Sequence, residues 1–308
     1  MRNLLIAGSA ILALGIGSAT AQERVAIGTG GTGGVFYAVG AAMAELINEE
    51  LDGVSATAEV TGASVENNRR VSMGEMQLGF SSASTLYAAA NGEDPFEETQ
   101  NVAAVAYLYP AALQIAALSS TGAQSIEDLS AVRLGIGPPG SNSAVIAERL
   151  LMAYDALNME NIQFLSYNEA TQAIRDGNLD ASAVLAGIPA AALIELATTE
   201  DVTFIPVDAD RVSGLLEEYP FYEVIDMAAG TYDGQDAAVG ILGDPAILFT
   251  SADADEELIY NLTATIFDNL DRLGQVHPAA ALISLERAEA TPIPLHPGAA
   301  RYFEEHGN

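Results

Sequence analysis

Short apolar segments typical of strands alternate along this chain with amphipathic segments typical of helices, and the alternation occurs twice in the same order. The expected strands, with the turns that follow them, are 25–29, 54–62 and 76–82 in the first set and 132–143, 162–167 and 181–187 in the second. Strands that alternate with helices in this way form a largely parallel sheet with helices on both faces. Two such sets predict an α/β protein with two doubly wound lobes.

Two longer apolar runs predict where the chain crosses from one lobe to the other. The first run, 101–120, contains Pro110, and the second, 239–251, contains Pro245. Each run is too long for one strand, and a proline in its middle removes a backbone donor from a sheet. We therefore expect a hinge at both runs. The expected lobes are residues 22–110 plus 236–308, and residues 111–235.

Glycines crowd the turn after the first expected strand, in the sequence VAIGTGGTGGVFYAVG (25–40). Gly28, Gly30 and Gly33 fit the G-x-G-x-x-G spacing of dinucleotide sites. Such a site also needs an acidic residue at the end of the second strand to bind the ribose, and here that strand ends in VTGAS. The spacing therefore does not by itself predict a nucleotide cofactor.

The same turn has a second property, because it exposes the backbone N–H groups at the start of a helix, which attract anions. The turns at 30–34 and 140–143 occupy equivalent places in the two sets, and both contain hydroxyl side chains. Ligands of open α/β sheets bind beyond the carboxyl ends of the strands. We therefore expect both turns to face one anion-binding cleft. The alternative is that the glycines only allow strand and helix to pack closely.

The charge balance excludes several classes of function. The chain has 42 acidic and 11 basic residues, a net charge of −31, and every basic residue is Arg. A nucleic acid would meet a field of its own sign, so none is expected as a partner. Without Lys, neither a Schiff base nor a P-loop lysine is possible. We interpret the acidic excess as a solvated surface.

The sequence also lacks the patterns of catalytic and metal sites. It has no Cys, no G-x-S-x-G and no H-E-x-x-H. His277, His296 and His306 lie near the C-terminus without metal-ligand spacing, and two of them precede Pro, which favours turn or cap roles. We expect no catalytic residue, no metal and no cofactor.

The first residues are typical of a secretory signal. Arg2 precedes an apolar run over 4–16, and an A-x-A cleavage site occupies 19–21. We expect residues 1–21 to be removed after Ala21 and the mature protein to be exported to the periplasm. Export without cysteine is compatible with a core large enough to need no disulfide.

Several segments follow one another in an order that resembles a known family. IGTGGTGGVFYAVGAAMAELIN is followed by TGASVENNRRVSMGEMQLGF, YLYPAALQI, SIEDLSAVRLGIGPPGSNS, AGIP, YPFYEVIDMAAGTYDGQD and LHPGAARYF. Over essentially the whole mature chain this series resembles the TAXI receptors, the solute-binding proteins of one class of TRAP transporters. The resemblance implies a type II periplasmic binding-protein fold with the ligand between two lobes. It also implies a small carboxylate ligand (glutamate, glutamine, 2-oxoglutarate or a similar dicarboxylate) and delivery to an ion-driven TRAP permease. We expect a monomer.

The resemblance also implies which residues bind the ligand. They are Gly31, Thr32, Gly33, Tyr37, Ser64, Asn67, Ser82, Tyr107, Ser141, Asn142, Ser143, Ala186, Gly187 and Tyr232. Of the two aromatic residues at the start of the first helix, Tyr37 is expected to face the ligand and Phe36 to fill the core. Ser82 and Ser84 stand where many relatives have Gln and Asp, which predicts a roomier pocket. Arg69 and Arg70 are expected in surface ion pairs.

Two other functions remain open at this point. The chain could be a sensing module that presents a small acid to a signalling protein, or an enzyme on the same fold. The enzyme has less support, because the sequence shows no nucleophile with a base. A neighbouring permease gene would favour transport, and a neighbouring kinase gene would favour sensing.

Overall fold

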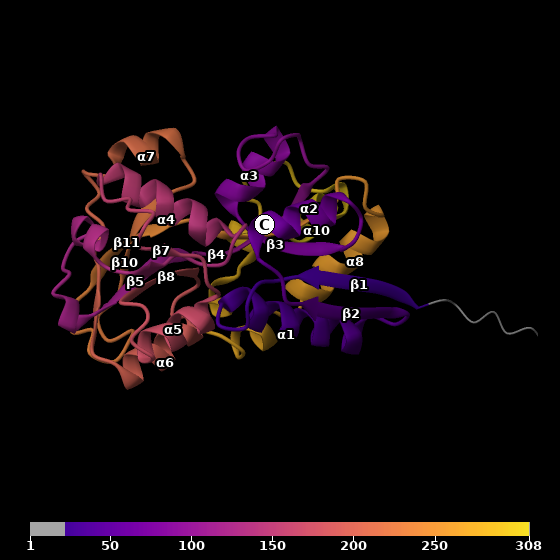
Figure 1. The fold of residues 1–308 in the computed structure, drawn as a ribbon. Coiled ribbons are helices and arrows are strands. Elements are labelled where there is room, and N and C mark those ends of the chain that lie inside the picture. Colours follow the sequence, from indigo (N-terminus) through magenta and orange to yellow (C-terminus); the bar gives the residue numbers. More distant parts are fainter. Residues whose placement is uncertain (1–21, 308) are drawn as a thin grey trace, which may run out of the picture.

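Two β-sheets with their helices form two lobes that lie side by side (Figure 1). The structure is a computed structural model that describes residues 22–307, so the expected signal peptide, residues 1–21, lies outside the described residues. Within residues 22–307, no helix is both long enough and apolar enough to cross a membrane. The two-lobed α/β architecture predicted from the alternation of strands and helices is confirmed.

The first sheet has five strands in the order β2-β1-β3-β12-β4. Its strands are β1 (Glu23–Gly28), β2 (Val54–Glu59), β3 (Leu78–Ser82), β4 (Ala103–Tyr109) and β12 (Ala246–Thr250). β1 is parallel to β2 and β3, whereas β12 is antiparallel to β3 and β4. The helices of this lobe are α1 (Val35–Glu50), α2 (Ser64–Ser72), α3 (Ala83–Asn91), α8 (Glu256–Phe267), α9 (Leu270–Gly274) and α10 (Pro297–His306). The parallel part of the sheet therefore has three carboxyl ends at one edge.

The second sheet has seven strands in the order β10-β11-β5-β8-β6-β7, with β9 also paired to β5. Its strands are β5 (Ala112–Leu118), β6 (Leu134–Gly135), β7 (Ile162–Gln163), β8 (Ala181–Ala186), β9 (Val202–Phe204), β10 (Glu223–Met227) and β11 (Val239–Gly243). β6 is parallel to β7 and β8, whereas β5 is antiparallel to β8, β9 and β11, and β11 is antiparallel to β10. This sheet is therefore mixed and not largely parallel, because the chain enters it through β5 and leaves it through β11. The helices of this lobe are α4 (Asn142–Ala153), α5 (Tyr167–Arg175), α6 (Ala191–Thr199) and α7 (Ser213–Glu218). The first three of these helices follow β6, β7 and β8, as the sequence predicts.

The chain passes between the two sheets at the two prolines. Pro110 and Ala111 separate β4 from β5, and Asp244 and Pro245 separate β11 from β12. Each long apolar run is therefore a pair of strands, one in each sheet. Because β11 belongs to the second sheet, the second passage comes later in the chain than the expected boundary after residue 235.

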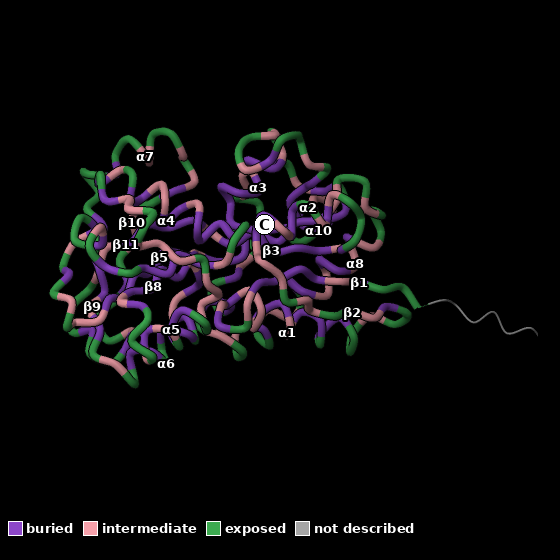
Figure 2. Tube along the Cα trace, viewed as in Figure 1, coloured by how far each residue is buried: buried purple, intermediate pink, exposed green. Residues whose placement is uncertain are grey.

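The buried face of α1 shows how the pattern of the sequence places the core. Val39, Met43, Leu46 and Ile47 recur at helical spacing and are all buried. Each such side chain stabilises the fold by about 1.5–3 kcal/mol when it is fully buried. Figure 2 shows the same arrangement across the molecule, with buried segments in the strands and on the inner sides of the helices.

Two segments differ from what the sequence predicts. The periodicity predicts one helix over 255–273, but the helix is interrupted between α8 and α9. At the interruption, the Asp268 carboxylate accepts a hydrogen bond from Tyr302 Oη at 2.7 Å, which holds this turn against α10. The stretch 208–238 is rich in turn residues, yet it contains α7 and β10. β10 is an edge strand in which only Met227 is buried, so it lacks the apolar alternation that would reveal it.

Candidate functional site

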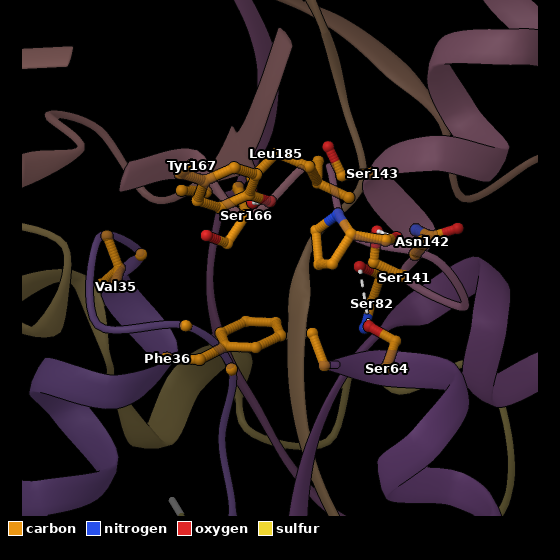
Figure 3. A pocket seen from close by; sticks show the side chains of 17 residues that line it. Val35, Phe36, Ser64, Ser82, Ser141, Asn142, Ser143, Ser166, Tyr167 and Leu185 are labelled. Carbon is orange, nitrogen blue, oxygen red and sulfur yellow. Dashed lines mark hydrogen bonds between the residues drawn. The ribbon is translucent and has the colours of Figure 1, made fainter. Parts of the chain in front are cut away.

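One pocket lies between the two lobes, beyond the carboxyl ends of their parallel strands (Figure 3). The space between its lining atoms is about 550 Å³, including the part that is open to solvent. Its lining residues are Gly30, Gly31, Gly34, Val35, Phe36, Ala63, Ser64, Ser82, Ala111, Pro138, Ser141, Asn142, Ser143, Ser166, Tyr167, Leu185 and Ala186. The turns at 30–34 and 140–143 therefore line one pocket, as the sequence predicts.

Five helices begin at this pocket. The residues that cap the N-termini of α1, α2, α3, α4 and α5 all line it, and they are Gly34, Ala63, Ser82, Ser141 and Ser166. The first N–H groups of a helix have no partner within the helix, and the helix dipole adds a partial positive charge there. Three of these helices belong to the first lobe and two to the second. In α3 the first N–H groups are already used, because Ala83 N donates to the carbonyl oxygen of Pro245 at 2.9 Å and Ser84 N to Asp244 Oδ1 at 3.1 Å, so the other four helix starts can attract a ligand. An anion in the pocket would therefore be attracted by both lobes.

The side chains around the pocket are neutral. Within the described chain, its lining contains no Asp, Glu, Lys, Arg or His. The polar side chains are those of Ser64, Ser82, Ser141, Asn142, Ser143 and Ser166. Across residues 22–307, no cluster of three or more His, Cys, Asp or Glu side chains could hold a metal ion. Neutral donors together with helix N-termini can bind an oxyanion, whereas a hard cation would need several oxygen ligands of negative charge.

A buried carboxylate lies directly behind the pocket. Asp244, in the second passage between the sheets, accepts hydrogen bonds from Ser84 N at 3.1 Å, from Ser84 Oγ, and from Asn142 Nδ2 at 2.7 Å. Burial raises the pKa of this carboxyl to about 6, although the hydrogen bonds act in the opposite direction. Ser84 lies in α3 of the first lobe and Asn142 begins α4 of the second. Asp244 therefore connects both lobes to the hinge, and the sequence marks only its position beside Pro245.

Half of the residues predicted to bind ligand line this pocket. They are Gly31, Ser64, Ser82, Ser141, Asn142, Ser143 and Ala186. Ser64 Oγ accepts a hydrogen bond from Ser82 N at 3.1 Å, so the start of α2 is fixed against the end of β3. Ser141 Oγ accepts from Ala144 N at 3.4 Å and thereby caps α4.

Thr32 and Gly33 lie where the lobes touch, outside the pocket lining. Asn168 Nδ2 donates a hydrogen bond to Thr32 Oγ1 at 3.1 Å, and Ala192 N donates to the carbonyl oxygen of Gly33 at 3.3 Å. A Cβ atom on Gly33 would lie 2.3 Å from Asn168 Oδ1 and 3.2 Å from Ala192 Cβ, so a larger residue would displace the Asn168 side chain from this contact. The two residues hold the lobes together beside the pocket.

Asn67 also has a place different from the expected one, because its polar atoms are already bonded within the first lobe. Its Nδ2 donates to the carbonyl oxygens of Thr29 and Phe80, both at 2.8 Å. Its Oδ1 accepts from Thr61 Oγ1 at 2.7 Å. Asn67 therefore joins α2 to the ends of β1 and β3 and fixes the geometry of the pocket from outside its lining.

The remaining predicted residues, Tyr37, Tyr107, Gly187 and Tyr232, lie outside the pocket lining. Tyr37 is half-buried on α1, and Tyr107 is buried in the core of the first lobe. Tyr232 Oη accepts a hydrogen bond from Ala190 N at 2.7 Å, and burial raises the pKa of its phenol. These side chains support the lobes around the site.

The pocket has an apolar wall that the sequence analysis did not predict. Phe36 lines the pocket and packs on Phe80 with ring centres 5.2 Å apart, so it occupies the place expected for Tyr37. Tyr167 lines the opposite lobe and donates from Oη to the carbonyl oxygen of Leu185 at 2.9 Å. The sequence does indicate where Tyr167 lies. Residues 166–169, SYNE, follow an apolar strand and have the S-x-x-E pattern of a helix N-terminus, which places Tyr167 at the start of a helix.

The two arginines on α2 do not line the pocket. Arg70 pairs with Glu59, Glu66 and Glu75 at distances of 2.8, 3.5 and 3.1 Å, which confirms the surface ion pairing expected for it. Arg69 instead donates a hydrogen bond from Nη2 to the carbonyl oxygen of Pro95 at 2.9 Å.

Comparison with known proteins is consistent with this architecture. Residues 27–307 match the model of the NMT1-like family. The chain belongs to this family. Among solved structures, this NMT1-like protein is similar to PhnD1 from Prochlorococcus marinus (MIT 9301) in complex with methylphosphonate, with a TM-score of 0.55 and 12% identity over 93% of this chain and 97% of that one.

Two further structures are similar at the same level. A protein from Bordetella bronchiseptica RB50 gives a TM-score of 0.55 and 17% identity over 91% of this NMT1-like chain and 87% of that one. A binding-protein component of an ABC phosphonate transporter from Pseudomonas aeruginosa gives a TM-score of 0.51 and 11% identity over 85% of this chain and 80% of that one. At these identities the likeness shows the fold, which is the two-lobed fold of periplasmic binding proteins, as the sequence resemblance implied.

Proposed function

We propose that this protein is an exported solute-binding protein that captures a small organic anion between its lobes and delivers it to a membrane transporter. The observation that carries the proposal is the meeting of five helix N-caps, from both lobes, in one pocket whose side chains are neutral. Unpaired N–H groups and serine hydroxyls donate hydrogen bonds to an oxyanion. A ligand bonded by both lobes favours the closed arrangement over an open one.

The proposed contacts are the seven predicted residues that line the pocket. Ser64 and Ser82 would contact the anion from the first lobe. From the second lobe, the backbone N–H groups at the start of α4 (Ser141, Asn142 and Ser143) would contact it, because Ser141 Oγ already donates to the carbonyl oxygen of Pro138 at 2.8 Å and Asn142 Nδ2 to Asp244 at 2.7 Å. The two passages between the sheets would serve as the hinge. The lining offers these serines no neighbouring side-chain base within the described chain, so we infer binding without chemical change of the ligand.

For the ligand and the transporter, we propose a small carboxylate and a TRAP permease, on the strength of the TAXI resemblance of the sequence segments. The phosphonate-binding proteins of similar fold suggest the competing possibility of an ABC-type system. The two kinds of transporter differ in energy source, because a TRAP permease uses an ion gradient and an ABC transporter uses ATP. Uptake by a TRAP system should stop when the ion gradient is collapsed and continue when ATP alone is depleted. We further propose the periplasm as the location, after removal of residues 1–21.

Native mass spectrometry of the mature protein, purified from the cells that export it, tests the binding function. We expect a small acid to copurify. Thermal shifts should then be measured with glutamate, glutamine, 2-oxoglutarate, glutarate, pentanesulfonate and methylphosphonate, because a ligand that binds only the folded state stabilises it by mass action. If no organic anion copurifies and none raises the melting temperature, the proposed function is wrong.

A further inference from the structure

The polar and apolar groups of the pocket are separated in space. Figure 3 shows Ser64, Ser82, Ser141 and Asn142 together on one side, and Val35, Phe36 and Tyr167 on the other. The four polar residues are at most 2% exposed, so an oxyanion held by them would be enclosed.

The hydroxyl groups on the apolar side are already engaged. Ser166 Oγ donates to Glu169 Oε2 at 2.7 Å and accepts from Glu169 N, and Tyr167 Oη donates to the carbonyl oxygen of Leu185. This side therefore offers a ligand mainly ring and aliphatic carbon. A ligand that fits both sides has one anionic end and an apolar body.

Within the described chain, no acidic side chain lines the pocket to pair with a cationic group. The nearest buried carboxylate behind it, Asp244, is 0% exposed and already accepts three hydrogen bonds from Ser84 and Asn142. An ammonium group enclosed without a carboxylate partner loses its hydration and gains little in exchange. The N-termini of α1, α2, α4 and α5 would oppose it further, because their dipoles present the same sign of charge.

We propose that this pocket selects organic anions that have an apolar body and no ammonium group, and that it discriminates against amino acids of the same length. This inference rests on the proposed function and narrows its ligand class. Among the acids that the sequence resemblance suggests, it places glutamate and glutamine below their analogues without an amino group.

The test is isothermal titration calorimetry of the mature chain with matched pairs of acids. Pentanoate and norvaline differ only in the ammonium group, as do glutarate and glutamate. We expect the acid without the ammonium group to bind at least tenfold more tightly in each pair. In the series acetate, propionate, butyrate and pentanoate, the affinity should rise about fourfold for each methylene, the effect of burying one CH₂ group.

Two variants test which side of the pocket binds the apolar body of the ligand and which side binds its carboxylate. Phe36→Leu keeps an apolar residue and should flatten the chain-length series, whereas Ser82→Ala should weaken all the carboxylates by a similar factor. Both variants should keep the wild-type circular dichroism. If norvaline and glutamate bind as tightly as pentanoate and glutarate, this inference is overturned while the proposed function stands. If none of these acids, and none of the anions tested above, binds at all, both are overturned.

Discussion

The carboxylate of Asp244 accepts a hydrogen bond from Asn142 Nδ2 at 2.7 Å and thereby joins the hinge to the pocket. Asn142 is the first residue of α4 and lines the pocket, whereas Asp244 lies between β11 and β12. The same carboxylate accepts from Ser84 in the first lobe. Any movement of one lobe relative to the other must therefore change the bonds of this one buried group.

The raised pKa of Asp244 gives the stability of the protein a specific pH dependence. Its folded pKa of about 6 lies above the ordinary value of 3.8 for an aspartate, so between these pH values the folded state binds more protons than the unfolded one. The contribution of this group to the free energy of unfolding therefore falls as the pH rises through that window, by up to about 3 kcal/mol. Asp244→Asn should remove this contribution.

Urea denaturation of wild type and Asp244→Asn at pH 4.5, 5.5, 6.5 and 7.5 measures this pH-dependent contribution of Asp244 to the free energy of unfolding. We expect the difference in unfolding free energy to change with pH in favour of the variant as the pH rises. His277 and His296, whose pKa values are lowered by burial, are present in both proteins and cancel in the difference. A difference that stays constant across this range would show that Asp244 has the same pKa in both states.

Backbone strain is concentrated at Ala63, the N-cap of α2. Its φ of 69° and ψ of −143° fall in a region that is occupied almost only by glycine. Ala63→Gly should therefore raise the free energy of unfolding by about 1 kcal/mol, because the strain relieved exceeds the added flexibility of the unfolded chain.

The matched control is Ala58→Gly in β2, where the backbone is extended and the same change should lower stability by about 0.5–1 kcal/mol. Chemical denaturation of the two variants side by side gives the answer. If Ala63→Gly lowers the free energy of unfolding as Ala58→Gly does, the backbone at Ala63 is not strained.

The contact between Asn168 and Thr32 should contribute to closure of the lobes. Asn168→Ala removes the hydrogen bond to Thr32 Oγ1, which is worth about 0.5–1.5 kcal/mol in favour of the closed arrangement. We expect ligand affinity to fall about two- to tenfold, with the circular dichroism of each lobe unchanged. Gln172→Ala, on the same helix but bonded only within it, should bind like the wild type. Equal affinity of both variants in calorimetry would contradict a role in closure.

The lobes and the two principal turns could be predicted from the sequence because both depend on local patterns. A strand followed by glycine or serine and then by a helix places the turn at the carboxyl end of a sheet. Gly28 and Gly31 differ in their surroundings within the glycine run. A Cβ on Gly28 would lie 2.7 Å from Asn67 Oδ1, so this glycine allows close packing, whereas Gly31 lines the pocket.

The parts of the site that could not be predicted depend on how the two lobes meet. Thr32 and Gly33 contact α5 and α6, which lie more than a hundred residues away in the chain, and Phe36 lines the pocket whereas its neighbour Tyr37 does not. Asp244 is one of many acidic residues in the sequence, and only its burial between the lobes distinguishes it. Contacts and burial of this kind are set by tertiary packing and leave no local pattern in the sequence.

The central claim, that an anion binds at the helix starts between the lobes, is tested most directly at Gly31. A Cβ atom on Gly31 meets no other atom within 4 Å, so the position accepts a side chain without disturbing the fold. Gly31→Asp places a carboxylate at the pocket, and Gly31→Asn is its neutral control of the same size. The measurement is the dissociation constant of both variants, by calorimetry, for the acid of the panel that binds wild type most tightly. We predict a loss on the order of 100-fold for Gly31→Asp relative to Gly31→Asn, the effect of two like charges about 4 Å apart. Equal affinity of the two variants would contradict the claim.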